Sequence, residues 1–163
     1  MYTELLEQTV RELKGEVELA APEPEIHLKV DAHLPEEYMP DMGDKLTFYH
    51  HLAMIRSEEE IADIEAEMRD RFGPVPEVVY NLFELMAIKF YLKKLKIKAI
   101  DFGNQKVVLT FSDQTPVDPL RLMERIEQKP EQYRMISSHK LVIGVKQWKE
   151  ILPLVRQLSN EWL

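Results

Sequence analysis

The 163-residue chain is 45% hydrophobic, which is enough to bury a sizeable core, and its length is typical of a single domain. Its formal net charge of −8 gives the whole molecule no long-range attraction to nucleic acids or anionic membranes, so contact with a phosphate backbone needs a local cationic patch. The absence of cysteine excludes disulfide scaffolds, cysteine-based metal sites and thiol nucleophiles.

The N-terminal part of the chain predicts a helix, a connector and a strand. Residues 1–14 predict a helix that Gly15 closes, because four apolar residues recur there at helical spacing: Leu5, Leu6, Val10 and Leu13. Residues 15–24 have the composition of a linker. Apolar and polar residues alternate over 26–34, which predicts a strand. The N-terminal residues lack the basic and then apolar segments of a signal peptide. No apolar run approaches the roughly 20 residues needed to cross a bilayer, so we expect a soluble chain.

Three helices are predicted next, over 44–55, 57–72 and 76–95. The first is expected to bury Leu46, Tyr49, Leu52 and either Ala53 or Ile55. Ser57 and Glu60 predict a capping box at the start of the second helix. The third is apolar over more than half of its circumference, which predicts that it lies at the centre of the core.

The C-terminal part predicts two strand pairs and two helices. The strands are expected at 97–102, 106–111, 133–136 and 140–145, and the helices at 119–128 and 147–162. Pro153 is expected to kink the last helix. Because helices precede most of the strands, we predict an α+β fold, with helices packed on a small, largely antiparallel sheet of about five strands.

The helix over 57–72 carries a charged sector and a strong stop signal. Gly73, Pro74 and Pro76 end it. At about 100° per residue, one sector beside the apolar stripe holds Glu60, Asp63, Glu67, Asp70 and Arg71. From the residues alone, the default interpretation is a solvated face with pairs such as Glu67 with Arg71 and Glu65 with Arg69, each worth about 0.3 to 0.5 kcal/mol.

No pattern in the sequence indicates catalysis, a metal or a cofactor. Neither a phosphate-binding loop nor a dinucleotide fingerprint is present, and the five glycines occur singly. His27 and His33 would lie about 20 Å apart on one strand, while His50 and His51 diverge on a helix. The run from Ser137 to His139 lies in one turn, and triads are built from separate elements.

One basic cluster offers a second interpretation. Lys89, Lys93 and Lys96 share a face of the third predicted helix and could contact phosphates. The simpler interpretation is that they form the wet side of that helix, because no aromatic or arginine residues are interleaved with them.

The string Glu67-x-x-Asp70-Arg71-Phe72-Gly73-x-x-Pro76 resembles a signature in the C-terminal domain of bacterial transcription-repair coupling factors. The resemblance continues in Leu34-Pro35-x-x-Tyr38-x-x-Asp41, in Lys45-Leu46-x-Phe48-Tyr49, and in the opening Tyr2-Thr3-Glu4-Leu5-Leu6-Glu7, which is similar to the end of the preceding helicase module. His50 and His51 stand where basic residues are expected in relatives. The order and spacing of these motifs cover nearly the whole chain.

The resemblance implies that the chain is a fragment, with residues 1–24 ending the helicase module and its linker and residues 25–163 forming the C-terminal domain. It implies a non-catalytic, monomeric domain of a cytoplasmic bacterial translocase that is driven by ATP. This domain would dock on a UvrB-like module of the same protein and mask its surface for UvrA, linking it indirectly to RNA polymerase and DNA. Glu67, Asp70 and Arg71, with Asp63 beside them, would form the interdomain contacts.

Two further hypotheses stay open at this point. The domain could contact DNA through Lys89, Lys93 and Lys96, or it could be an independent enzyme of unknown reaction. Neither needs a membrane or a bound cofactor.

Overall fold

The computed structural model describes residues 23–162. In chain order, the elements are β1 (Glu25–His27), α3 (Met42–Ala53), α4 (Glu59–Phe72), α5 (Glu77–Leu95), β2 (Ile97–Gly103), β3 (Lys106–Phe111), α6 (Pro119–Gln128), β4 (Tyr133–Met135), β5 (Lys140–Gly144), a 3-10 turn (Trp148–Glu150) and α7 (Ile151–Trp162). The helix predicted over 1–14, and the connector as far as residue 22, lie outside the described residues. No helix within 23–162 is long and apolar enough to cross a membrane.

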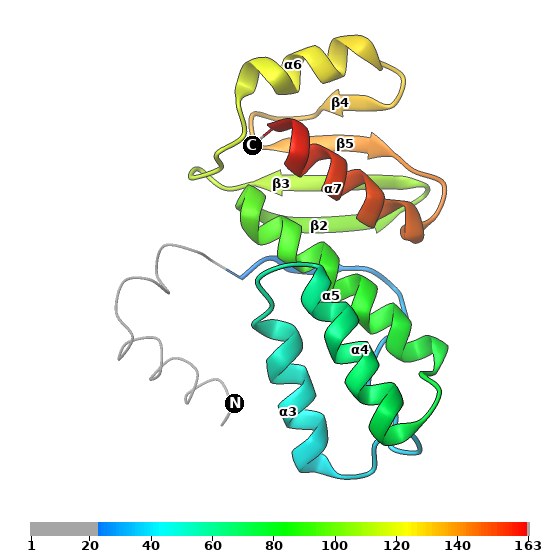
Figure 1. Cartoon of the computed structure of the whole chain (residues 1–163). Coiled ribbons are helices and arrows are strands. Elements are labelled where there is room, and N and C mark those ends of the chain that lie inside the picture. Colours follow the sequence, from blue (N-terminus) through cyan, green and yellow to red (C-terminus); the bar gives the residue numbers. More distant parts are fainter. Residues whose placement is uncertain (1–22, 163) are drawn as a thin grey trace, which may run out of the picture.

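The five strands form one mixed sheet in the order β1-β2-β3-β5-β4. β1 runs parallel to β2, and the other three neighbouring pairs are antiparallel. Helices α5 and α7 lie over one face of this sheet, while α3 and α4 pack beside α5 in the other half of the molecule (Figure 1). The predicted α+β class and the largely antiparallel sheet are therefore confirmed.

Two apolar clusters make up the core, and α5 contributes to both. The first lies between the sheet, α7 and the C-terminal half of α5, and it includes Ile88, Leu92 and Leu95 of that helix. The second joins α3, α4 and the N-terminal half of α5, and it includes Val79, Leu82 and Phe83. The prediction that this helix lies at the centre of the core is confirmed.

The strand predicted over 26–34 is wrong beyond His27. After β1 the chain leaves the sheet as an irregular segment and runs from one apolar cluster to the other, with Leu28 packed in the first and Leu34 in the second. Its backbone is held by side chains instead of a strand: the Leu34 N–H donates to the Tyr49 hydroxyl over 3.0 Å, and Asn81 donates to the Asp31 carbonyl over 3.1 Å. An alternating pattern therefore marks an extended segment here without a neighbouring strand.

Several local expectations about the helices are also corrected. Leu52 of α3 is buried as predicted, but Leu46 is 63% exposed and Phe48 is buried in its place, because Phe48 and Leu52, four residues apart, form the stripe that faces the core. Helix α4 begins at Glu59 without a side-chain cap, so the Ser57 capping box is absent. Instead, Glu60 accepts a hydrogen bond from the Arg56 backbone N–H.

The last predicted helix is divided into two parts, a 3-10 turn and α7. Pro153 lies in the first turn of α7, where a backbone N–H has no partner within the helix to lose. The predicted kink within a continuous helix is therefore replaced by a change of helix type at Glu150 and Ile151.

One ion pair ties the two halves of the molecule together beyond their shared helix. Arg156 of α7 donates from Nε and Nη2 to the two carboxylate oxygens of Glu58, at 2.8 and 2.9 Å, just before α4 begins. The hydrogen bond from Arg156 lowers the pKa of Glu58. Because both side chains are partly shielded and the contact is bidentate, it belongs among the stronger surface pairs.

We predict that Arg156→Gln lowers the free energy of unfolding by about 1 kcal/mol at neutral pH. The folded-state pKa of Glu58 lies below its ordinary value of 4.5, so this stabilisation is present above that pH and is lost as the pH falls through the folded-state pKa. Urea unfolding at several pH values measures it. Arg134→Gln is the control, because Arg134 is exposed and forms no ion pair with a described residue. A difference between wild type and Arg156→Gln that stays constant into strong acid would contradict this assignment.

Candidate interdomain docking surface

Helix α4 carries the charged sector on its exposed side, and its apolar stripe is buried in the core. Ile64 and Met68 are buried against α3 and α5, and Phe72 is half-buried at the helix end. The four predicted site residues are all exposed: Asp63, Glu67, Asp70 and Arg71. The structure therefore brings them together along one helix, as their spacing predicts.

Arg71 is held in place by groups of its own domain. Its guanidinium donates to Glu67 over 3.4 Å and to Asp44 of α3 over 3.2 Å. The same guanidinium lies 5.0 Å from the ring centroid of Phe72 and 5.5 Å from that of Phe48. Arg71 thus links α4 to α3, and part of its hydrogen-bonding capacity is used within the domain.

Asp63 and Asp70 differ from Arg71 in having no internal partner. Within residues 23–162, neither carboxylate makes a hydrogen bond or an ion pair. They lie seven residues apart, about two helical turns, and so point to similar sides of α4. These two carboxylates are free to accept hydrogen bonds from a partner.

The neighbouring side of α4 is anchored to α5. Glu65 accepts hydrogen bonds from Arg69, four residues further along, and from the Tyr80 hydroxyl over 2.7 Å. The hydrogen bonds of the Arg69 guanidinium to Tyr80 and Glu65 raise the pKa of Arg69. The expected pairs of Glu65 with Arg69 and Glu67 with Arg71 are both present, but each is joined by a third residue from another helix.

The end of α4 is fixed by Gly73 and Tyr38. Gly73 has φ of 90° and ψ of −164°, a conformation that is essentially restricted to glycine. The Tyr38 hydroxyl donates to the Gly73 carbonyl over 2.9 Å and to the Met68 carbonyl over 3.3 Å. Burial raises the pKa of the Tyr38 phenol, which keeps it a donor. The predicted stop is confirmed, although its backbone is extended rather than left-handed helical.

The lysine face of α5 is largely engaged. Lys89 and Lys93 form ion pairs with Glu23, at 2.9 and 3.2 Å, where the connector meets the domain. Burial alone would raise the pKa of Glu23, but the hydrogen bonds and charges of these two lysines outweigh it and lower the pKa. Lys96 ends the helix in a left-handed conformation. Two of the three lysines proposed for DNA contact thus have partners within the chain.

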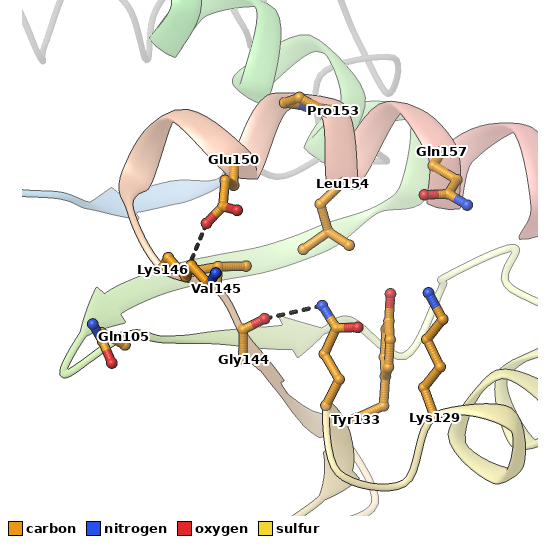
Figure 2. A pocket seen from close by; sticks show the side chains of 11 residues that line it. Gln105, Lys129, Tyr133, Gly144, Val145, Lys146, Glu150, Pro153, Leu154 and Gln157 are labelled. Carbon is orange, nitrogen blue, oxygen red and sulfur yellow. Dashed lines mark hydrogen bonds between the residues drawn. The ribbon is translucent and has the colours of Figure 1, made fainter.

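A pocket of about 540 Å³ lies between α7, the end of β5 and the loop before β4 (Figure 2). Its lining contains no serine, threonine, cysteine or histidine. Glu150 accepts hydrogen bonds from the backbone N–H groups of Lys146 and Gln147, and Gln132 donates to the Gly144 carbonyl. A Ser–His–Asp series lies outside this pocket, in exposed loops: Ser138 Oγ is 2.9 Å from His139 Nδ1, and His139 Nε2 is 2.9 Å from Asp113. Within residues 23–162, no group of three or more His, Asp or Glu side chains is arranged to hold a metal.

Sequence reasoning missed the residues that support the site from other elements. Tyr38, Asp44 and Tyr80 lie between 15 and 35 positions from the residues of α4 and its C-cap that they contact. Only Tyr38 carried a signal, because it belongs to the motif Leu34-Pro35-x-x-Tyr38. Its role as the anchor of the helix end gives that motif a physical reason.

Comparison with known proteins places this arrangement in a family. The model of the TRCF domain matches residues 28–122, more than half of the chain and all of α3, α4 and α5. The chain belongs to the TRCF domain family.

Its relatives include transcription-repair-coupling factors of three bacteria. The chain is 32% identical to the protein of Haemophilus influenzae, in an alignment that covers 82% of this chain. It is 28% identical to the proteins of Escherichia coli and Myxococcus xanthus, in alignments that cover 99% and 90% of this chain. It spans only 12 to 15% of the length of these proteins. The chain therefore corresponds to one domain of a much longer protein.

A solved structure has the same fold. The crystal structure of the C-terminal domain of a transcription-repair coupling factor superposes with a TM-score of 0.73, covering 86% of this chain and 94% of that one. The two sequences are 22% identical, so this likeness establishes the fold alone. The expected match to the C-terminal domain is confirmed.

We predict that Gly73→Ala destabilises the domain by about 1 to 2 kcal/mol, because a Cβ is unfavourable at positive φ. An added Cβ at this position meets no atom within 4 Å, so the loss reports on the backbone conformation and not on a clash. Gly103→Ala is the matched control: it is equally open, has no positive φ, and should change the stability by less than about 0.5 kcal/mol. Equal unfolding midpoints in urea for both variants would show that the stop does not depend on Gly73.

Proposed function

We propose that this chain is the regulatory C-terminal domain of a transcription-repair coupling factor and that it docks through α4 on a UvrB-like module of the same protein. Docking would cover the surface of that module that binds UvrA and so hold the parent in an autoinhibited state. The observation that carries the proposal is a pair of exposed carboxylates, Asp63 and Asp70, that have no partner among residues 23–162 and lie on a helix fixed at both ends.

The free carboxylates are the primary contact in this proposal, and Glu67 and Arg71 have a secondary role. Arg71 already bonds to Asp44 and Glu67, so a partner meets it as part of a preformed network. Such a network costs little conformational entropy on docking, because its side chains are already ordered. A complementary basic surface on the partner would set the orientation of docking more than its affinity.

Exposed apolar side chains on α3 provide further contact area in the same half of the molecule. Met42 and Leu46 are each 63% exposed and lie four residues apart, so they form a short apolar stripe. Exposed ion pairs contribute about 0 to 1 kcal/mol each, which a modest apolar contact supplements. The tether within one chain adds an effective concentration of about millimolar, so the resulting contact is reversible.

The same proposal assigns no catalysis to this domain. The described residues hold no phosphate-binding loop, and their one hydrogen-bonded Ser138–His139–Asp113 series is exposed to solvent at all three residues. ATP-driven translocation would belong to the preceding module in the bacterial cytoplasm, and RNA polymerase and DNA would be its partners. Residues 1–24 would connect the two parts, and the contact of Glu23 with Lys89 and Lys93 supports a boundary near residue 24.

We predict that the double reversal Asp63→Lys with Asp70→Lys in the full-length parent raises its affinity for UvrA about five- to thirtyfold. Losing two contacts of about 0.5 to 1 kcal/mol each accounts for this range, because 1.4 kcal/mol is a factor of ten. The measurement is the equilibrium binding of UvrA to wild type and variant. Both aspartates are exposed, so the domain should keep its thermal unfolding midpoint.

The matched control for this test is Glu124→Lys with Glu127→Lys. These residues are exposed on α6, and the control changes the net charge equally. Its UvrA affinity should equal that of wild type. Unchanged binding in the α4 variant, or an equal rise in both, would overturn the assignment of docking to α4.

A further inference from the structure

The face of the sheet turned away from α5 and α7 is not covered by any described helix (Figure 1). Along β3, Val107, Leu109 and Phe111 are buried under the helices, so the residues between them point to the other side. The same alternation holds in β5. We call this second side the open face; it includes Lys106, Val108, Thr110, Lys140, Val142 and Arg134, which the pairing register places in adjacent rows.

The open face is cationic in an acidic protein. Four exposed cations lie on it or at its end: Lys98, Lys106, Arg134 and Lys140. None of them forms an ion pair with a described residue, in contrast to Lys89 and Lys93 of α5. Two acids also lie on this side of the sheet, Asp101 of β2 opposite Val108 and Glu25 of the edge strand β1, and both contact His27. The charge of −8 is therefore unevenly distributed, with a cationic sheet face and an acidic α4.

A pocket of about 590 Å³ lies at one end of this face, formed by β2, β3, β5 and the two loops beside them. Lys98 and Lys140 both line it. The register shifts between Ile97 and Ala99, so Lys98 is the extra residue of an irregularity in the ladder. Such bulges redirect a side chain, and here the redirected residue is a lysine at the pocket.

The remaining polar lining supplies hydrogen-bond donors. Ser137 accepts a bond from the His139 backbone N–H over 3.2 Å, which leaves its hydroxyl proton available to a ligand. Thr110 and Gln114 add further donors. The one acid of the pocket, Asp113, is bound to His139 Nε2 at 2.9 Å. Two ammonium groups surrounded by hydroxyl and amide donors form a lining suited to phosphate oxygens.

We propose that the open face and its end pocket bind the phosphate backbone of double-stranded DNA. No Phe, Tyr or Trp lies in the described strand rows of this face, and Phe111, which lines the end pocket, is buried in the core, so the surface lacks the stacking platform on which single strands are bound. The contacts go to phosphates and carry no base readout, and the binding is independent of sequence. This surface is separate from α4, so the inference does not rest on the proposed function.

The number of cations sets the expected salt dependence. If each of the four neutralises one phosphate, the logarithm of the affinity falls with the logarithm of the salt concentration with a slope of about −3.6. The acidic remainder of the chain opposes binding, so the affinity is that of a weak non-specific contact. Such a contact would add to the DNA binding by other domains of a longer parent protein.

The test uses the 163-residue chain and a short DNA duplex, with binding measured by fluorescence anisotropy over a series of salt concentrations. Wild type should bind at low salt with the slope given above. Lys98→Glu with Lys140→Glu should halve the slope to about −1.8 and weaken binding at low salt at least tenfold. The matched control, Lys94→Glu with Lys129→Glu, makes the same change in net charge at two exposed positions, one in α5 and one at the C-cap of α6, and should retain most of the affinity.

Three results would overturn the proposal. The first is no salt-dependent binding by wild type, and the second is an equal loss in both double variants, which would mean attraction by overall charge alone. The third is competition by polyglutamate as effective as that by duplex DNA, which would assign the face to an acidic protein segment. Far-ultraviolet circular dichroism confirms that each variant is folded, so a loss of binding reports on the surface.

Discussion

The burial of α5 on both halves of its length is the constraint on which the rest of the structure depends. Its 19 residues span about 28 Å, long enough to take part in two apolar clusters in succession. Without the C-terminal half of α5, the sheet could not bury the face that the helices cover. Without the N-terminal half, α3 and α4 would have no apolar core to pack on. Because one rigid helix serves both, the two halves have a fixed relative position.

This constraint turns α4 from an ordinary surface helix into an oriented surface. Its buried residues contact α5, its start is tied to α7 through Glu58 and Arg156, and its end is fixed by Tyr38 and Gly73. Charges on a mobile helix would lose much of their interaction energy to ordering, whereas charges on a fixed helix retain it. The open face of the sheet is fixed by the same helix, so the two candidate surfaces are held rigidly by one core.

The sequence predicted what depends on neighbours along the chain and missed what depends on distant partners. The stop at Gly73, the long central helix and the exposed charged sector follow from spacing and local conformation, and all are present. The prediction of a strand over 26–34 was wrong because alternating apolar and polar residues indicate an extended backbone, but they do not show whether another strand pairs with it. Arg71 was predicted as an interdomain contact residue, but its restraint by Asp44, 27 positions away, and by two aromatic rings was not predicted. Tertiary partners of this kind leave no periodic signal.

The central claim is that α4 is covered by another part of the longer protein. Carbodiimide labelling of carboxylates, followed by mass spectrometry, tests this directly in the resting full-length parent and in the 163-residue chain. Asp63 and Asp70 should be labelled several-fold more slowly in the parent, while Glu124 and Glu127 of α6 are labelled at equal rates in both. Equal labelling of all four carboxylates in the two proteins would contradict the claim.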